Sequence, residues 1–173
     1  MMVLFVEDVM KKLCLLALLM ATHAQAFQAT KEDMVGVWQC YTDAYDIADD
    51  TTIKSVTLDR LNQDGTMSQV WEVVSYAGKE VESIEYLTIK NGWDFKDDKL
   101  SIYDWKLIDY QVYDGYKLPF DETVVKKAKQ YWQSEYNEPY SETLKFINER
   151  EFVFENEDKE TINVRSGCTK KDS

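Results

Sequence analysis

Short segments with the period of β-strands, separated by turn residues, fill the chain from residue 35 to about residue 118. The clearest turn is Asn62-Gln63-Asp64-Gly65, and Asn91-Gly92 and Asp97-Asp98 give further turn signals. Short strands at regular spacing are typical of an antiparallel sandwich or barrel. We therefore expect an all-β fold of about eight or nine strands. The expected strands are residues 35–41, 53–61, 66–75, 80–89, 93–95, 100–110, 142–147, 152–155 and 161–166.

One segment changes from the strand period to the helical period. Val124 and every fourth residue after it, up to Tyr136, are apolar. This spacing places them on one stripe of an α-helix. Asp121 is suited to the N-cap, because its side chain can accept a hydrogen bond from the first turn. We predict one helix at about residues 121–136.

The first 26 residues have the features of a secretory signal peptide. Lys11-Lys12 precedes the apolar run at residues 13–21, and Ala24-Gln25-Ala26 forms a cleavage site. The run is too short to span a membrane, which needs roughly 20 apolar residues, so we expect no stable membrane anchor. Met10 is an alternative start. We expect a bacterial periplasmic or secreted domain at residues 27–173.

The remaining chain has no histidine, a residue on which many catalytic sites depend. The only histidine, His23, lies in the leader, which excludes Ser-His-Asp and Cys-His arrangements and His-ligated metals from the mature domain. Of the three cysteines, Cys40 and Cys168 remain, and an even pair in an oxidising compartment predicts a disulfide. Carboxylates are plentiful, but nothing singles out two of them as an acid/base pair. We expect no enzyme.

Acidic residues dominate the charge of the chain. The formal net charge is −12, which argues against nucleic acid and favours a basic partner or simple solubility. Asp43, Asp46, Asp49 and Asp50 are close enough in sequence to suggest calcium, but they lack the glycine and terminal glutamate of an EF-hand loop. We interpret them as a solvated acidic loop and expect neither a metal nor a cofactor.

Three short motifs place the chain close to a known family. Gly36-Val37-Trp38 opens the first expected strand, and two later hairpins read DGT (residues 64–66) and NGWDFKDDKLSI (residues 91–102). Together they resemble the first-strand motif and repeated hairpins of bacterial lipocalin-like (calycin-type) domains. The resemblance implies an antiparallel up-and-down β-barrel, often a carrier of small apolar molecules. Arg165 resembles the arginine that packs over the tryptophan in that family. Gly36, Trp38 and Arg165 would therefore plug the barrel, and a disulfide would join its first and last strands.

Aromatic side chains are the candidate contacts for a ligand or a partner. Trp71 shares one strand face with Val73 and Ser75, and we expect Tyr103, Trp105 and Leu107 to share another, opposite Ile102. Residues 109–116 are rich in tyrosine and are expected to form a loop, where tyrosine often makes binding contacts. The candidate residues are Trp71, Tyr103, Trp105, Tyr110, Tyr113, Tyr116, Tyr131 and Trp132. The same side chains could instead be ordinary core.

Two functions fit these observations. The first is an exported, non-catalytic binding protein that holds a small apolar or amphipathic ligand in its barrel. The second is a periplasmic immunity protein or inhibitor, whose acidic surface binds and blocks a basic secreted enzyme or toxin. The sequence leaves the ligand and the oligomeric state open.

Overall fold

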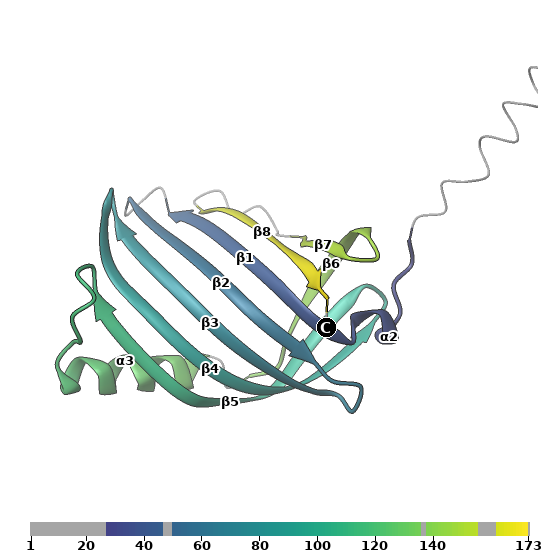
Figure 1. Cartoon of the computed structure of the whole chain (residues 1–173), viewed down its shortest axis with the longest axis horizontal. Helices are drawn as coiled ribbons and strands as arrows, with labels where there is room; N and C mark the ends of the chain where they lie inside the picture. Colours follow the sequence, from purple (N-terminus) through teal and green to yellow (C-terminus); the bar gives the residue numbers. More distant parts are fainter. Residues whose placement is uncertain (1–26, 47–49, 136–137, 156–161, 173) are drawn as a thin grey trace, which may run out of the picture.

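The computed structural model describes residues 27–46, 50–135, 138–155 and 162–172, so the expected signal peptide lies outside the described residues. Two helices, α2 (Lys31–Met34) and α3 (Glu122–Glu135), accompany eight strands in these segments (Figure 1). The strands are β1 (Gly36–Asp46), β2 (Thr51–Leu61), β3 (Thr66–Ala77), β4 (Glu80–Lys96), β5 (Lys99–Asp114), β6 (Tyr140–Asn148), β7 (Glu151–Phe154) and β8 (Ile162–Lys171).

All eight strands belong to one antiparallel sheet. Each strand pairs with the next in sequence order, and β1 also pairs with β8, so the pairing forms a closed ring. The mainly β, antiparallel architecture expected from the strand and turn pattern is confirmed. The pairing of β1 with β8 leaves neither the first nor the last strand as a free edge along that seam, and free edges are what recruit other chains.

The predicted disulfide between Cys40 and Cys168 is confirmed. The two cysteines lie directly opposite each other on β1 and β8 and are separated by 128 residues in sequence. A cross-link over so long a loop stabilises the folded chain by at most about 5 kcal/mol in the chain-entropy model. It therefore holds together the one strand pair whose partners lie at opposite ends of the domain.

The register of β1 and β8 determines which side chains point into the ring. Directly paired residues of antiparallel strands share a face, and a shift of one residue moves a side chain to the other face. Trp38 pairs with Lys170 on the inner face, whereas Arg165 pairs with Asp43 on the outer face and is exposed.

Trp38 fills the end of the ring that α2 covers, which we call the capped end. The side chain is 1% exposed and packs against Phe152, with ring centroids 4.9 Å apart. The cation above the indole is Lys170, whose Nζ lies 5.3 Å from the ring centroid. The prediction that Arg165 packs over this tryptophan is wrong, because Arg165 lies on the opposite face of β8. Gly36 leaves room for this lysine, since a Cβ at Gly36 would come within 3.0 Å of the Lys170 Cε.

Helix α2 closes the capped end through side-chain contacts with the strands. The indole Nε1 of Trp38 donates to the carbonyl of Met34 at 2.8 Å, and Lys170 Nζ donates to the carbonyl of Asp33 at 2.6 Å. These bonds use carbonyls at the end of the helix, which otherwise lack partners. Thr30 and Asp33 form a capping box at the other end. A four-residue helix is thereby held in place across the base of the sheet.

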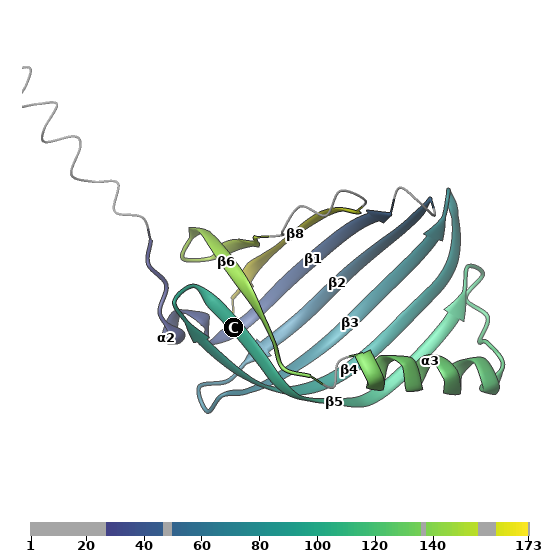
Figure 2. The same cartoon turned by 180° about the vertical axis from the view of Figure 1, so that it is seen from behind.

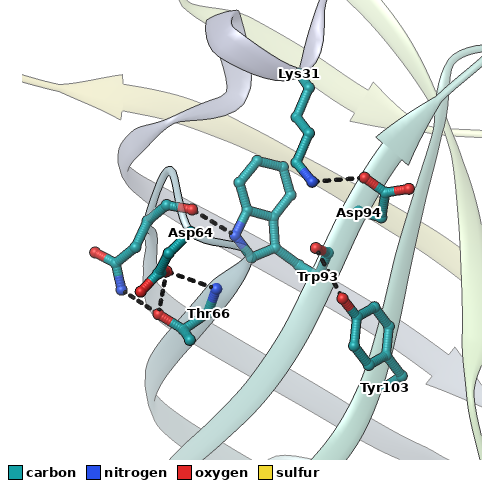
Figure 3. A network of polar contacts seen from close by, with 7 residues as sticks. Lys31, Asp64, Thr66, Trp93, Asp94 and Tyr103 are labelled. Atoms are coloured by element: carbon teal, nitrogen blue, oxygen red, sulfur yellow. Dashed lines mark hydrogen bonds and ion pairs between the residues drawn. The ribbon is translucent and has the colours of Figure 1, made fainter.

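A second buried tryptophan, Trp93, has a similar environment at the same end (Figure 3). Its Nε1 donates to the carbonyl of Asn62 at 3.0 Å, and Lys31 Nζ lies 5.1 Å from its ring centroid. Lys31 also forms a 2.7 Å ion pair with Asp94. The core around both tryptophans consists of Met34, Trp38, Cys40, Leu61, Met67, Trp93, Phe95, Leu100, Ile102, Leu144, Phe152 and Cys168. The capped end is therefore filled with side chains.

Strands β4 and β5 are longer than the sequence pattern predicts. Asn91-Gly92 is not a turn but lies inside β4, where the pairing with β5 is irregular. Gly92 is needed there because a Cβ would overlap the ring of Tyr103, which covers it from β5. The turn between the two strands is Asp97-Asp98, where both residues have positive φ. Residues 93–95 are consequently the end of β4 and not a separate strand.

Helix α3 lies within the range predicted for a helix and follows its expected N-cap. Asp121 Oδ1 accepts a hydrogen bond from the Thr123 backbone N at 2.8 Å, which also lowers the pKa of Asp121. Strand β6 pairs only with residues 99–102 of β5, so the rest of β5 has no β6 partner. Helix α3 occupies this region, on the inner side of β4 and β5 (Figure 2).

Replacement of Lys170 should destabilise the capped end, whereas replacement of Arg165 should not. Lys170→Met removes the cation from the Trp38 ring and the hydrogen bond to Asp33, and should lower the free energy of unfolding by about 1–2 kcal/mol. Arg165→Met is the matched control and should change it by less than about 0.5 kcal/mol. Urea titration followed by tryptophan fluorescence measures both. Equal effects of the two substitutions would contradict the assignment of Lys170.

Candidate functional site

The inner face of β1 and β2 at the far end of the sheet, opposite α2, is not filled. Thr42 and Ala44 on β1 and Ser55 and Thr57 on β2 point inward but stay partly exposed. Ile53, also inward, is 43% exposed. Helix α3 covers the inner side near β4 and β5, and neither of the two described helices covers β1 and β2 at this far end (Figure 2). The inner face of β1 and β2 at the far end therefore presents a surface of mostly small, partly exposed side chains.

Four of the eight candidate binding residues meet beside this surface. Trp71 on β3, Trp105 and Tyr110 on β5, and Trp132 on α3 belong to one apolar cluster under the helix. The rings of Trp71 and Trp132 meet edge to face, with centroids 5.9 Å apart. The other members of the cluster are Val73, Leu87, Ile89, Leu107, Val112, Phe120, Val125 and Ala128. This aromatic cluster joins the helix to the sheet.

A carboxylate that sequence reasoning missed, Glu85, lies at the edge of this cluster. Tyr110 Oη donates to Glu85 Oε2 at 2.8 Å, and Trp132 Nε1 donates to the same oxygen at 2.7 Å. Burial raises the pKa of Tyr110, and the hydrogen bond to Glu85 raises it further, so the phenol stays protonated and remains a donor. The alternation of β4 could have identified Glu85, because it shares the inward face with Leu87 and Ile89.

The other four candidate residues lie outside the cluster. Tyr103 is 37% exposed and packs over Gly92, while Tyr116 and Tyr131 are 89% and 58% exposed. The expected shared face of Tyr103, Trp105 and Leu107 is wrong. Asp104 has a φ of 53°, and the irregular pairing around it separates the inward residues Trp105 and Leu107 from Tyr103.

Tyr113 contributes to a hollow on the outer face. Residues 109–114 were expected to form a loop, but they continue β5 as a strand. The hollow has a volume of about 370 Å³ and is lined by Ile84, Tyr86, Gln111, Tyr113 and Lys117. The rings of Tyr86 and Tyr113 form its aromatic wall, with centroids 6.1 Å apart.

Apolar side chains also form a continuous group on the outer face. Tyr41 pairs with Val56, and Leu58 pairs with Val70 on the neighbouring strand. Tyr41 and Val70 are each 52% exposed, Leu58 48% and Val56 45%. We call these four residues the outer apolar group. Exposed apolar groups of this kind are typical of surfaces that contact other proteins.

A chain of buried polar side chains crosses the inside of the ring. Asn91 Nδ2 donates to Gln69 Oε1, and Gln69 Nε2 donates to Asp59 Oδ1 at 3.0 Å. The Oδ1 atom of Asn91 has no hydrogen-bond partner among the described residues. Burial raises the pKa of Asp59 to about 6, although hydrogen bonds from Gln69 and Thr57 oppose the rise.

Among the described residues, no three His, Cys, Asp or Glu side chains are grouped so that they could hold a metal ion. Of the acidic loop considered for calcium, Asp49 lies outside the described residues. None of the helices described is long and apolar enough to cross a membrane.

Comparisons with protein-family models and with curated proteins find no match.

Asp59→Asn should make the stability of the protein less dependent on pH. The Asp59 pKa is about 6 in the folded chain, against about 3.9 in an unfolded one, so folding loses stability as the pH rises through 6. Asparagine does not ionise, so the variant should gain stability over the original chain as the pH rises. The difference in unfolding free energy between the two should grow by up to about 3 kcal/mol from pH 4 to pH 7.5, because one unit of pKa shift corresponds to about 1.4 kcal/mol. Urea unfolding at both pH values measures it. The exposed Asp109→Asn is the control, and a gain from Asp59→Asn that is independent of pH would contradict the raised pKa.

Proposed function

We propose that the chain is an exported, non-catalytic binding protein whose lipocalin-like up-and-down barrel takes up a small apolar or amphipathic ligand. The observation that carries this proposal is the difference between the two ends of the sheet. Trp38 and Trp93 are 1% and 0% exposed at the capped end, whereas Ile53 is 43% exposed on the inner face of the far end. A ligand that enters at the far end would contact the aromatic cluster on one side and small side chains on the other.

Several features support a lipocalin-like fold. The strands follow one another in sequence order, and the first carries a Gly-x-Trp motif whose tryptophan lies under a cation. A helix closes the end that holds this tryptophan. The position of α3 between β5 and β6 differs from that family, in which the helix follows the last strand.

Export is supported by the disulfide and by the leader-like pattern of the sequence. A disulfide persists in an oxidising compartment such as the bacterial periplasm or the extracellular space. The absence of histidine after residue 26 removes the commonest general base, which favours binding over catalysis.

A bulky residue on the inner face should block the ligand, whereas the same residue on the outer face should not. Ser55→Phe places a ring on the inner face, and Lys54→Phe places it on the outer face one residue earlier. Dodecanol, titrated below its solubility limit, should quench tryptophan fluorescence of the original chain and of Lys54→Phe alike. Ser55→Phe should weaken binding about tenfold or more, since it fills the space that the alkyl chain needs. Equal affinities of the two variants would contradict the inner site.

The outer apolar group favours a second function, the blocking of a basic secreted enzyme or toxin. Its four members are exposed together on β1, β2 and β3, and the chain carries a net charge of −12. Apolar contact at the centre with acidic residues around it would suit a basic protein surface.

Val70→Asp should abolish such an interaction. Val70 is 52% exposed, so the added charge should leave the fold intact while it disrupts an apolar interface. The control is Ile108→Asp, because Ile108 is 44% exposed and lies outside the group. The immobilised chain should retain a basic protein from periplasmic extract at low salt. We expect the Ile108→Asp variant to retain the basic protein and the Val70→Asp variant to lose it. Equal retention of the basic protein by both variants would contradict this function.

A further inference from the structure

Glu85 brings a carboxylate to the inner face beside the aromatic cluster, and its chemistry therefore goes beyond apolar binding. It is a partly exposed carboxylate beside an apolar cluster, and its paired neighbours across the sheet, Val73 and Val112, are apolar. None of the ion pairs formed among the described residues involves it. A charged side chain in such a place is costly to the fold unless a partner compensates it.

We propose that the ligand carries an organic ammonium group, and that Glu85 and the surrounding rings bind this group. This inference rests on the proposed ligand-binding function and specifies the chemical class of the ligand. The apolar part of the ligand would then lie along the inner face of the far end.

The hydrogen bonds of Glu85 leave it able to accept a cation. Tyr110 and Trp132 both donate to Oε2, and none of the described residues donates to Oε1. A carboxylate has about four lone-pair sites, so two bonds to one oxygen leave acceptor capacity on the other. The two donors come from a strand and from α3, and they hold the carboxylate in one orientation without neutralising its charge.

The rings around Glu85 also favour a cation. Trp132 donates to the carboxylate, and its ring meets the ring of Trp71 edge to face, with the two centroids 5.9 Å apart. The faces of indole and phenol rings attract ammonium ions, more strongly where water is partly excluded. A carboxylate and aromatic rings in one place therefore reinforce each other, whereas an anionic ligand would be repelled by Glu85 and by the net charge of −12.

Glu85 is partly exposed with α3 in the position observed, and small side chains lie beside it on the inner face. Ser83 precedes Glu85 on the inner face of β4, and Ser75 pairs with Ser83 from β3. Both serines are partly exposed, as are Ser55 and Thr42 on the next strands. These small side chains connect Glu85 with the uncovered part of the inner face.

Four probes with the same alkyl chain test the head group. Dodecylamine, dodecyltrimethylammonium, dodecanol and laurate are titrated below their critical micelle concentrations, and binding is followed by tryptophan fluorescence and isothermal titration calorimetry. The original chain should bind the two ammonium probes about tenfold or more tightly than dodecanol, and laurate most weakly. A primary amine can also donate hydrogen bonds to Glu85, which the quaternary probe cannot do.

Glu85→Gln tests the residue. Glutamine can still accept the hydrogen bonds of Tyr110 and Trp132, so the fold should be retained, which near-ultraviolet circular dichroism checks. The substitution should remove the preference for the ammonium probes and leave the affinity for dodecanol within about twofold. Glu72→Gln is the matched control, because it removes the same charge from the outer face of β3.

Each outcome separates this inference from the proposed function. If dodecanol binds the original chain as tightly as the ammonium probes, cation recognition is wrong but ligand binding stands. If none of the four probes binds, both are wrong. If Glu85→Gln and Glu72→Gln weaken ammonium binding equally, the attraction comes from the net charge, and the assignment to Glu85 is overturned.

Discussion

The pairing of β1 with β8 is the constraint on which the rest of the structure depends. These strands lie at the two ends of the domain, so theirs is the strand pairing of longest sequence separation and the one most opposed by chain entropy. The disulfide from Cys40 to Cys168 holds them in one register. That register decides the face of every residue on both strands. It places Trp38 and Lys170 inside and Arg165 outside, and so determines what fills the capped end.

The general architecture and the disulfide could be predicted from the sequence, because alternation, turn residues and cysteine number are local or countable signals. Lys170 could also have been predicted. Once Cys40 and Cys168 are taken as directly opposed, the antiparallel register pairs Trp38 with Lys170 and leaves Arg165 on the other face. The resemblance to a family gave the wrong residue because it matched a residue type and did not apply the register.

The failures of sequence reasoning on β4 and β5 share a physical cause. Asn91-Gly92 has the composition of a turn, but the ring of Tyr103 needs a residue without a side chain beneath it, and this tertiary contact outweighs the local preference. Asp104 has a positive φ in mid-strand, and this irregularity shifts the face of Trp105 and Leu107, until a second irregularity after Leu107 shifts the register back. The aromatic cluster depends on this shift, because strict alternation would have placed Trp105 on the face of Tyr103. Composition alone therefore identified Trp71, Tyr110 and Trp132 as candidates but could not reveal that they meet near Glu85.

The buried polar chain divides the interior into two parts. On β3, Gln69 lies between Met67 of the capped-end core and Val73 of the aromatic cluster, and on β4, Asn91 lies between Ile89 and Trp93 in the same way. Asp59 continues the division on β2, where its Oδ2 lies 3.6 Å from Cys40 Sγ. Each polar group in this row must keep its hydrogen-bond partner. The row therefore allows fewer packing arrangements of the interior than a continuous apolar core would allow. The two apolar clusters are thus separated inside a single sheet. The capped end can supply the packing that stabilises the fold, while the far end keeps the exposed inner face that the proposed ligand binding requires.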